Sequence, residues 1–242
     1  MIVGLLHPGA MGSAIGNALA GAGHDVIWAS AGRSEATRAR AAGFRDVGTA
    51  QALAAEAEVI LSICPPNAAL AVAGEVAGFD GLYVDANAVS PARARGVAAL
   101  HPEFVDGGIV GGPPQTAGET RLYLSGERAA EVAGLFDGTI VGVRICPDAS
   151  ALKMAYAAWS KGTAALLLSI RDVAAFYGVG DELATEWAES QPELLERLPA
   201  AERSAAAKGW RWAGEMDEIA DTFGTAGAPR GFHEAAAEVY RA

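Results

Sequence analysis

The sequence predicts an α/β fold: a Rossmann-type, doubly wound, mostly parallel sheet followed by an all-α C-terminal domain. Short apolar runs alternate with helical stretches through residue 146, as in a parallel sheet covered by helices on both faces. A glycine-rich turn follows the first apolar run. No strand is indicated after Cys146, so we expect one domain over residues 1–147 and a helical one over residues 148–242.

The apolar runs of the first domain predict its strands. Each run is short and bounded by glycine, proline or polar residues, as is typical of buried parallel strands. The strands are expected over residues 1–6, 26–29, 57–64, 82–87, 103–109, 121–126 and 139–146. Helices are expected after the glycine turn, over residues 34–43, 67–76 and 128–136, and from Pro91.

The second domain is predicted to consist of helices alone. A long alanine- and leucine-rich helix is expected over residues 150–177, leaving the first domain without a flexible linker. Pro192, Pro199 and the segment 224–229 are expected to separate the helices that follow. Apolar residues recur there at i, i+4, i+7 and i+11, a spacing typical of a core or subunit interface: Trp212, Met216, Ile219 and Phe223.

Composition limits the classes of partner. The 242 residues carry a net charge of −11, with 51% hydrophobic and 19% charged residues, which is a globular composition. Such an acidic chain repels nucleic acid and anionic membranes. With no basic leader and no apolar run of ~18 residues, a soluble cytoplasmic protein is expected. Cys64 and Cys146 are expected to be reduced thiols, and no metal-ligand spacing is present.

The glycine turn at residues 7–12 predicts a dinucleotide site. A G-x-G-x-x-G turn between a strand and a helix brings backbone close to a pyrophosphate, which binds at the helix N-terminus. Gly9 and Gly12 supply the second and third glycines, and His7 replaces the first. We expect Gly9, Ala10, Met11 and Gly12 to contact the cofactor, with a purely structural turn as the alternative. For His7, we favour a purely structural role, in which it fills the turn, over a functional role near the phosphates.

The end of the second strand favours NADP over NAD. An NAD site requires an acidic residue there for the ribose 2′-hydroxyl, whereas NADP requires cationic and hydroxyl donors. No acid follows Trp28, and Arg33 is flanked by Ser30 and Ser34, which suits a 2′-phosphate. Alternatively, Ser34 caps the next helix; both roles are compatible.

In its order of motifs, the chain resembles the β-hydroxyacid dehydrogenase and 6-phosphogluconate dehydrogenase superfamily. The matching features are the glycine turn, the segment 85–91 (DANAVSP), the glycines Gly111 and Gly112, and Lys153 early in the long helix. The stretches GWRWAGEMDEIADTF and GFHEAAAEVY are similar to a branch that joins an NAD(P)-binding domain to a C-terminal domain of unknown function.

This resemblance implies a dimeric oxidoreductase with its cleft between the domains. It implies that Gly111 and Gly112 bind substrate and that Lys153 is the acid/base. Two positions depart from the characterised hydroxyacid enzymes: Val110 replaces a serine that binds the substrate carboxylate, and Tyr156 and Ala157 stand where those enzymes have an asparagine. Both departures weaken the expectation of a simple hydroxyacid substrate.

The side chains near these motifs suggest a hydride-transfer site. Helical spacing places Lys153, Tyr156 and Ser160 on one face, where Tyr156 is expected to replace the missing asparagine and Ser160 to contact substrate. Asn87, at a strand end, is expected to contact nicotinamide or substrate, with a turn-forming role as the alternative. The backbone at Cys64 and Pro65 is expected to pass along the cofactor, without thiol chemistry.

Together these features predict an NADP-dependent oxidoreductase acting on a small carbonyl or hydroxy compound. The alternatives are an imine reductase and a catalytically silent NADP-binding protein. A homodimer and a small-molecule substrate are the expected partners, with nucleic acid and membrane excluded.

Overall fold

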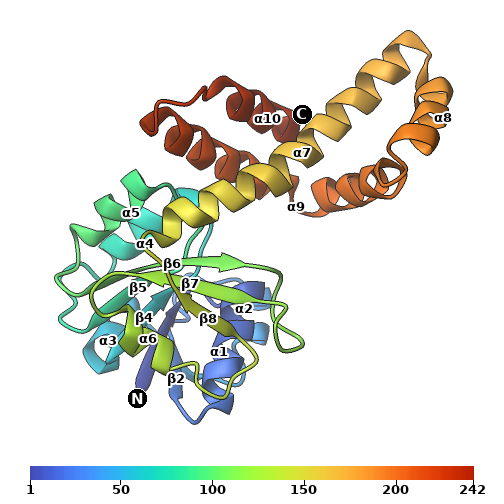
Figure 1. Ribbon diagram of the computed structural model, residues 1–242. Coiled ribbons are helices and arrows are strands. Elements are labelled where there is room, and N and C mark those ends of the chain that lie inside the picture. The colour runs from blue at the N-terminus through green and yellow to red at the C-terminus, as the bar shows by residue number, and fades with distance from the viewer. The chain divides into compact units, whose positions relative to one another are not determined.

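The computed structural model describes all 242 residues, which divide into two compact units, Met1–Lys153 and Met154–Ala242. The first unit is an eight-stranded, mostly parallel sheet with helices, and the second is entirely helical (Figure 1). This architecture confirms the predicted fold class. The division falls inside a long helix that begins at Ala149, just after the expected boundary at 147/148.

The sheet has the strand order β3-β2-β1-β4-β5-β6-β7-β8. Every neighbouring pair is parallel except β6 and β7. Because the order reverses on either side of β1, a ligand is expected beyond the carboxyl ends of β1 and β4. The strands are β1 (Ile2–Leu6), β2 (Asp25–Trp28), β3 (Arg45–Asp46), β4 (Val59–Ser62), β5 (Leu82–Asp85), β6 (Phe104–Val110), β7 (Arg121–Ser125) and β8 (Gly142–Ile145).

Helices cover the sheet on both faces. Successive residues of a strand point to opposite faces, so Val3 and Leu5 of β1 join one buried apolar cluster and Leu6 joins the other. The helices are α1 (Ala10–Gly21), α2 (Glu35–Arg40), α3 (Ala50–Glu56), the 3-10 turn η1 (Pro66–Ala68), α4 (Ala69–Gly74), α5 (Pro91–Ala98) and α6 (Ala129–Gly134).

The second unit is built from the rest of α7 (Ala149–Tyr177), then α8 (Gly180–Ser190), α9 (Leu194–Thr225) and α10 (Gly231–Arg241). Pro192 separates α8 from α9, as expected, but the expectation that Pro199 would end a helix is wrong, because it lies inside α9. It stands in the second turn, where its missing N–H leaves the carbonyl of Leu195 without an intrahelical partner, and Leu195 is exposed to water.

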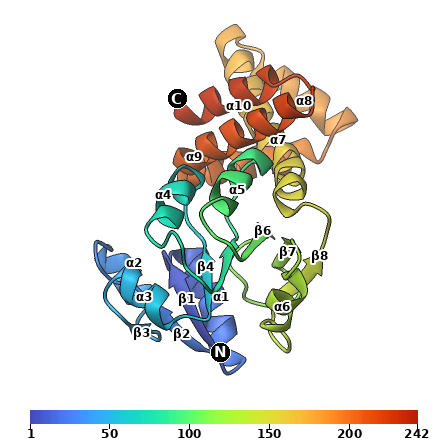
Figure 2. The ribbon, with the colours of Figure 1, turned by 90° about the vertical axis from the view of Figure 1, so that its left-hand side faces the viewer.

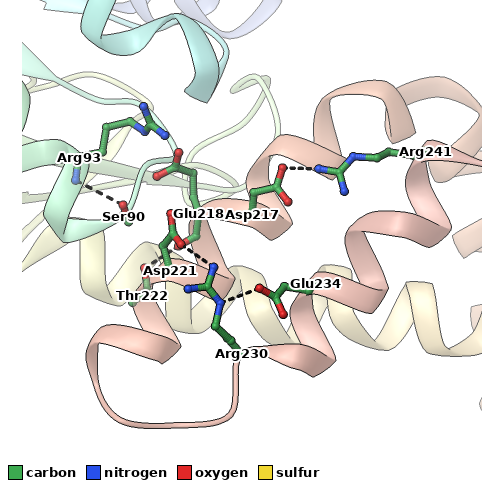
Figure 3. Close-up of polar contacts among 9 residues, drawn as sticks. All are labelled: Ser90, Arg93, Asp217, Glu218, Asp221, Thr222, Arg230, Glu234 and Arg241. Atoms are coloured by element: carbon green, nitrogen blue, oxygen red, sulfur yellow. Dashed lines mark hydrogen bonds and ion pairs between the residues drawn. The ribbon is translucent and has the colours of Figure 1, made fainter.

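Helices α9 and α10 run side by side (Figure 1 and Figure 2). Met216 and Ile219 are fully buried, and the rings of Trp212 and Phe223 contact rings of α10. The apolar stripe of α9 is therefore core. Exposed ion pairs also link the two helices: Arg230 contacts Asp221 of α9 and Glu234 of α10, and Arg241 of α10 contacts Asp217 of α9 (Figure 3). No helix has the length and apolar character needed to span a membrane.

Candidate functional site

The glycine turn joins β1 to α1 and has the shape of an anion site. A Cβ on Gly12 would stand 2.8 Å from the His7 carbonyl oxygen, so only glycine fits the close approach of helix to turn. A Cβ on Gly9 would meet nothing within 4 Å, which leaves this side of the turn open. Helix α1 has neither a side-chain cap nor an acidic residue in its first turn. The N–H groups at its start, including those of Ala10 and Met11, therefore suit a pyrophosphate.

His7 has an unusual backbone and a specific side-chain partner. Its φ is +64°, and no other non-glycine residue of the chain has a positive φ. Nη1 of Arg33 donates to Nδ1 of His7 at 3.0 Å. Burial and the positive charge of Arg33 lower the pKa of His7 to about 4, so the imidazole is neutral. Nη2 of Arg33 lies 3.6 Å from Glu75.

The end of β2 supplies the other residues predicted for the 2′-phosphate. The Ser30 hydroxyl is engaged with Asp46, and this hydrogen bond lowers the pKa of that carboxyl. Ser34 caps α2 by accepting from the Thr37 N–H at 3.3 Å, which confirms the capping alternative. A second cation lies nearby, because Arg38 donates to the Ser30 carbonyl at 2.7 Å.

Asn87 links the carboxyl ends of β4 and β5. It is 2% exposed, its Oδ1 accepts from the Cys64 N–H at 2.5 Å, and its Nδ2 donates to Ser62 at 3.1 Å and to Asp85. Both ends of its amide are thus engaged within the protein, and its own N–H donates to Asp85 at 3.1 Å. The side chain of Asn87 therefore joins the ends of the two strands instead of forming the turn before Ser90, and the local turn contact is made by Asp85, which accepts from the Asn87 N–H.

Asp85 is a buried carboxyl with one unpartnered oxygen. Its Oδ1 accepts from Asn87, and its Oδ2 has no hydrogen-bond partner. Burial raises the pKa of Asp85 to about 7, and the nearby Asp106 adds to the rise. Burial likewise raises the pKa of Cys64 to about 12, so this thiol stays protonated. Pro65 is exposed and precedes η1.

Three side chains anchor the start of α7 to the first unit. Ser125 accepts from the Ala149 N–H at 2.9 Å, Asp106 from the Ser150 N–H at 2.8 Å, and Asp148 from the Ala151 N–H at 2.7 Å. Asp106 also accepts from the Ser150 hydroxyl at 2.6 Å. Because the first N–H groups of a helix otherwise lack partners, this arrangement fixes where α7 begins.

The anchored helix holds Lys153 against β6. Nζ of Lys153 donates to the carbonyl oxygen of Ile109 at 2.7 Å. A Cβ on Gly108 would stand 2.8 Å from the Ala149 carbonyl oxygen and 2.9 Å from Cβ of Lys153, so glycine permits the contact between helix and strand. The ammonium therefore lies beside the segment that leads into Gly111 and Gly112.

The Gly111–Gly112 segment is exposed, and its backbone conformation at Gly111 requires glycine. Gly111 has φ +113°, and a Cβ there would stand 2.2 Å from the Glu119 carbonyl oxygen. Thr120 donates to the Gly112 carbonyl at 2.5 Å, and the side of Gly112 where a Cβ would lie is open. The structure thus brings Lys153 and the predicted substrate glycines to the same end of β6.

Tyr156 and Ser160 belong to the second unit. Along α7 they follow Lys153 by one and two helical turns. Tyr156 is 48% exposed, and Ser160 is exposed with its hydroxyl donating to the Ala157 carbonyl at 3.4 Å. Both side chains are accessible on α7.

Sequence analysis missed Arg38, Glu75 and the contact between His7 and Arg33. Arg38 and Glu75 resemble ordinary surface charges in the sequence. A histidine in place of the first glycine was the available signal, but its partner is 26 residues away in the chain. Only the fold brings them together.

Models of two protein families match different parts of the chain. Residues 2–89 match the model described as "NADP oxidoreductase coenzyme F420-dependent". Residues 174–242 match the model "Domain of unknown function (DUF1932)". This chain joins the two domains in that order. This combination agrees with the predicted one, an NAD(P)-binding domain followed by a helical domain of unknown function.

A curated relative is an uncharacterized 28.5 kDa protein from Methanothermus fervidus, 30% identical over 161 residues. The match covers 63% of this chain and 62% of that protein, less than two thirds of its length.

Solved structures share the fold along the whole chain. The conserved protein MTH1747, of unknown function and described as similar to 3-hydroxyacid dehydrogenases, is 24% identical, with a TM-score of 0.72 over 100% of this chain and 96% of that one. The 3-hydroxyisobutyrate dehydrogenase of Mycobacterium tuberculosis is 17% identical, with a TM-score of 0.72 over 99% and 92%. A reductive aminase from Aspergillus terreus, in complex with NADPH, is 17% identical, with a TM-score of 0.60 over 99% and 92%.

Proposed function

We propose that this protein is an NADP-dependent oxidoreductase that transfers hydride between the cofactor and a small carbonyl or hydroxy compound, with Lys153 as acid/base. The observation that carries the proposal is the position of Lys153 at the end of β6, with Nζ 2.7 Å from the Ile109 carbonyl oxygen. The ammonium lies next to Gly111 and Gly112, in a chain whose N-terminal domain matches an NADP oxidoreductase model.

Lys153 would donate a proton to the substrate oxygen on reduction and accept it on oxidation. When bound, the nicotinamide ring supplies or takes up the hydride. The Ile109 carbonyl accepts one of the three ammonium N–H donors and orients the ammonium. Gly111 and Gly112 would offer backbone to the substrate. Tyr156 and Ser160 would add hydroxyl groups along the same helix.

The cofactor would bind along the β1–α1 turn. The open side of Gly9 and the uncapped start of α1 suit a pyrophosphate. At the end of β2, Arg33 would contact the 2′-phosphate, supported by Ser30 and Ser34. No carboxylate follows Trp28 to accept from a ribose 2′-hydroxyl, so NADPH should bind more tightly than NADH.

An imine reductase is the second candidate. Val110 replaces the serine expected for a carboxylate-bearing substrate, and the reductive aminase from Aspergillus terreus shares the fold. A catalytically silent NADP-binding protein is the third candidate. A panel of 2-ketoacids, 3-ketoacids, aldehydes and cyclic imines, followed by NADPH absorbance, would distinguish the candidates. Turnover of imines alone would support the second, and binding without turnover the third.

The role of Lys153 is tested by Lys153→Ala on any substrate that the panel identifies. Turnover should fall by at least about a hundredfold, the usual contribution of a positioned acid/base, while NADPH affinity stays within about twofold. Lys208→Ala, which removes an exposed lysine of α9, is the matched control and should retain full activity. Retained turnover in Lys153→Ala would refute the acid/base assignment.

We also propose a homodimer. The resemblance implies one, and the C-terminal end of α7 and the turn to α8 expose four large apolar side chains. We call this the α7–α8 surface; its exposed members are Val173, Phe176, Tyr177 and Val179. The surface includes a hollow of about 340 Å³, lined by Ser169, Ile170, Val173, Ala174, Tyr177, Val179 and Leu183. Exposed apolar side chains clustered in this way are typical of a subunit interface.

A further inference from the structure

We propose that His7 is a positioning residue that fixes the Arg33 guanidinium for the 2′-phosphate of NADPH and thereby sets the preference for NADPH over NADH. The inference rests on the proposed use of NADP. It assigns a role to the histidine that stands where the dinucleotide turn ordinarily has its first glycine.

The backbone conformation of His7 is unfavourable for a residue with a side chain. At φ +64° a glycine would be relaxed, whereas an L-residue is strained. The turn therefore favours glycine on conformational grounds. A side chain kept in such a conformation indicates that the side chain itself has a function.

The contact with Arg33 identifies that function. A guanidinium only donates, so Nδ1 of His7 must be the acceptor and the ring proton must be on Nε2. Nε2 is buried and has no hydrogen-bond partner, so the ring makes its one polar contact through Nδ1. Burial and the charge of Arg33 keep the pKa of His7 at about 4, and the acceptor persists at neutral pH.

Arg33 would then have one permanent partner and one exchangeable partner. Its side chain is 16% exposed, and His7 holds Nη1 from the side of the dinucleotide turn. Glu75 pairs with Nη2 at 3.6 Å, and its side chain is 42% exposed. A 2′-phosphate can displace an exposed carboxylate at 3.6 Å more readily than the shorter contact with a neutral ring. Preorganising an arginine in this way raises affinity for the phosphate.

Two substitutions at position 7 separate the side chain from the backbone. His7→Gly removes the acceptor and suits the positive φ. His7→Asn also tolerates this conformation, and its Oδ1 is as many bonds from Cα as Nδ1 is in histidine. Fluorescence titration with NADPH and NADH should show about tenfold weaker NADPH binding in His7→Gly, with NADH binding unchanged. His7→Asn should stay within about threefold of the parent protein for both.

The double variant tests whether His7 acts through Arg33. Arg33→Ala should weaken NADPH binding at least as much as His7→Gly, and adding His7→Gly to Arg33→Ala should cause no further loss. Thermal shift with 2′,5′-ADP should show the same order of variants. The melting temperature of His7→Gly without ligand should equal or exceed that of the parent protein, which shows that the fold is intact.

The outcomes that would contradict these expectations separate the role of His7 from the NADP assignment. If His7→Gly binds NADPH normally, weakens both cofactors equally, or adds to Arg33→Ala, the positioning role is wrong while the NADP assignment stands. If Arg33→Ala leaves the ratio of NADPH to NADH affinity unchanged, the NADP assignment at Arg33 is wrong, and the role of His7 falls with it.

Discussion

At the scale of single residues, the proposed site predicts that Glu75 competes with the cofactor for Arg33. Replacing it by glutamine removes a charge that repels the 2′-phosphate and frees the guanidinium. An exposed ion pair is worth at most about 1 kcal/mol, so Glu75→Gln should raise NADPH affinity by up to about fivefold and leave NADH affinity unchanged.

Glu131 provides a matched control for this titration. Its side chain is also 42% exposed and pairs with an arginine, Arg128, at 2.7 Å. Glu131→Gln should leave both cofactor affinities as they are. Weaker NADPH binding in Glu75→Gln would contradict the displacement of Glu75 by phosphate.

Asp85 makes the stability of the protein depend on pH. Its folded-state pKa of about 7 is above its unfolded value, so ionisation of Asp85 costs stability as pH rises from about 4 to about 7. The total cost is at most about 4 kcal/mol. In Asp85→Asn the cost is absent, while the side-chain oxygen can still accept from Asn87.

Denaturant unfolding of both proteins at pH 5, 6, 7 and 8 would measure this effect. The stability of Asp85→Asn relative to the parent protein should increase with pH up to about 7 and level off above it. Comparing the two proteins cancels the contributions of His7 and of other groups that titrate in the same range. A difference independent of pH would show that Asp85 is ionised throughout.

The sequence identified the residues that carry local chemistry, but not how they pair. Gly9, Gly12 and Arg33 follow from the motif and the strand end alone. Two sets of hydrogen bonds depend on where β1, β2, β4 and β5 lie in the sheet. These are the bond between His7 and Arg33 and the bonds made by the side-chain amide of Asn87. Such contacts join residues more than 20 positions apart, which periodicity does not report.

At the scale of elements, the contact of α7 with β6 depends on Gly108. Gly108→Ala would push the helix from the strand, because the new Cβ would lie 2.8 Å from the Ala149 carbonyl oxygen and 2.9 Å from Cβ of Lys153. We expect the free energy of unfolding to fall by about 2 kcal/mol, as measured by chemical denaturation.

Gly112→Ala is the control for this substitution. Its Cβ would meet nothing within 4 Å, so the free energy of unfolding should change by less than about 0.5 kcal/mol. If Gly108→Ala were equally stable, α7 would have to shift freely over β6, and Lys153 would not be fixed in position.

Elements with strong patterns were predictable, and elements without them were not. Apolar runs gave seven of the eight strands in the sheet order, and the alanine-rich pattern gave α7. The two-residue β3 lies at the sheet edge, and α3 shows no apolar periodicity beyond Ala50 and Leu53. The continuation of α9 through Pro199 was missed because a proline beyond the first turn ordinarily ends or kinks a helix.

At the scale of the whole molecule, the α7–α8 surface predicts the oligomeric state. Analytical ultracentrifugation should give about twice the chain mass of 24.6 kDa. Phe176 is 82% exposed on this surface, so Phe176→Asp should shift the protein to the monomer. Trp210→Asp, which changes a 72% exposed aromatic residue of α9, should remain dimeric. A monomeric parent protein would exclude the proposed dimer.

The fold class and the joining of two domains were predictable at this scale, because alternation of strands and helices is a property of the chain as a whole. The point at which the chain divides was harder to place. The helix α7 crosses it without a break in pattern, so no loop or composition change marks Lys153 and Met154 as the last and first residues of the two units.

The strand order also bears on how fast this chain reaches its native state. The central strand β1 is synthesised before its partner β4, which begins only at Val59. Closing such distant parallel pairs is slow, whereas α9 and α10 are neighbours in the chain and can dock soon after synthesis. We therefore expect refolding in two phases, a fast gain of helix and a slower completion of the sheet, with the apolar edges of β1 exposed to aggregation in between.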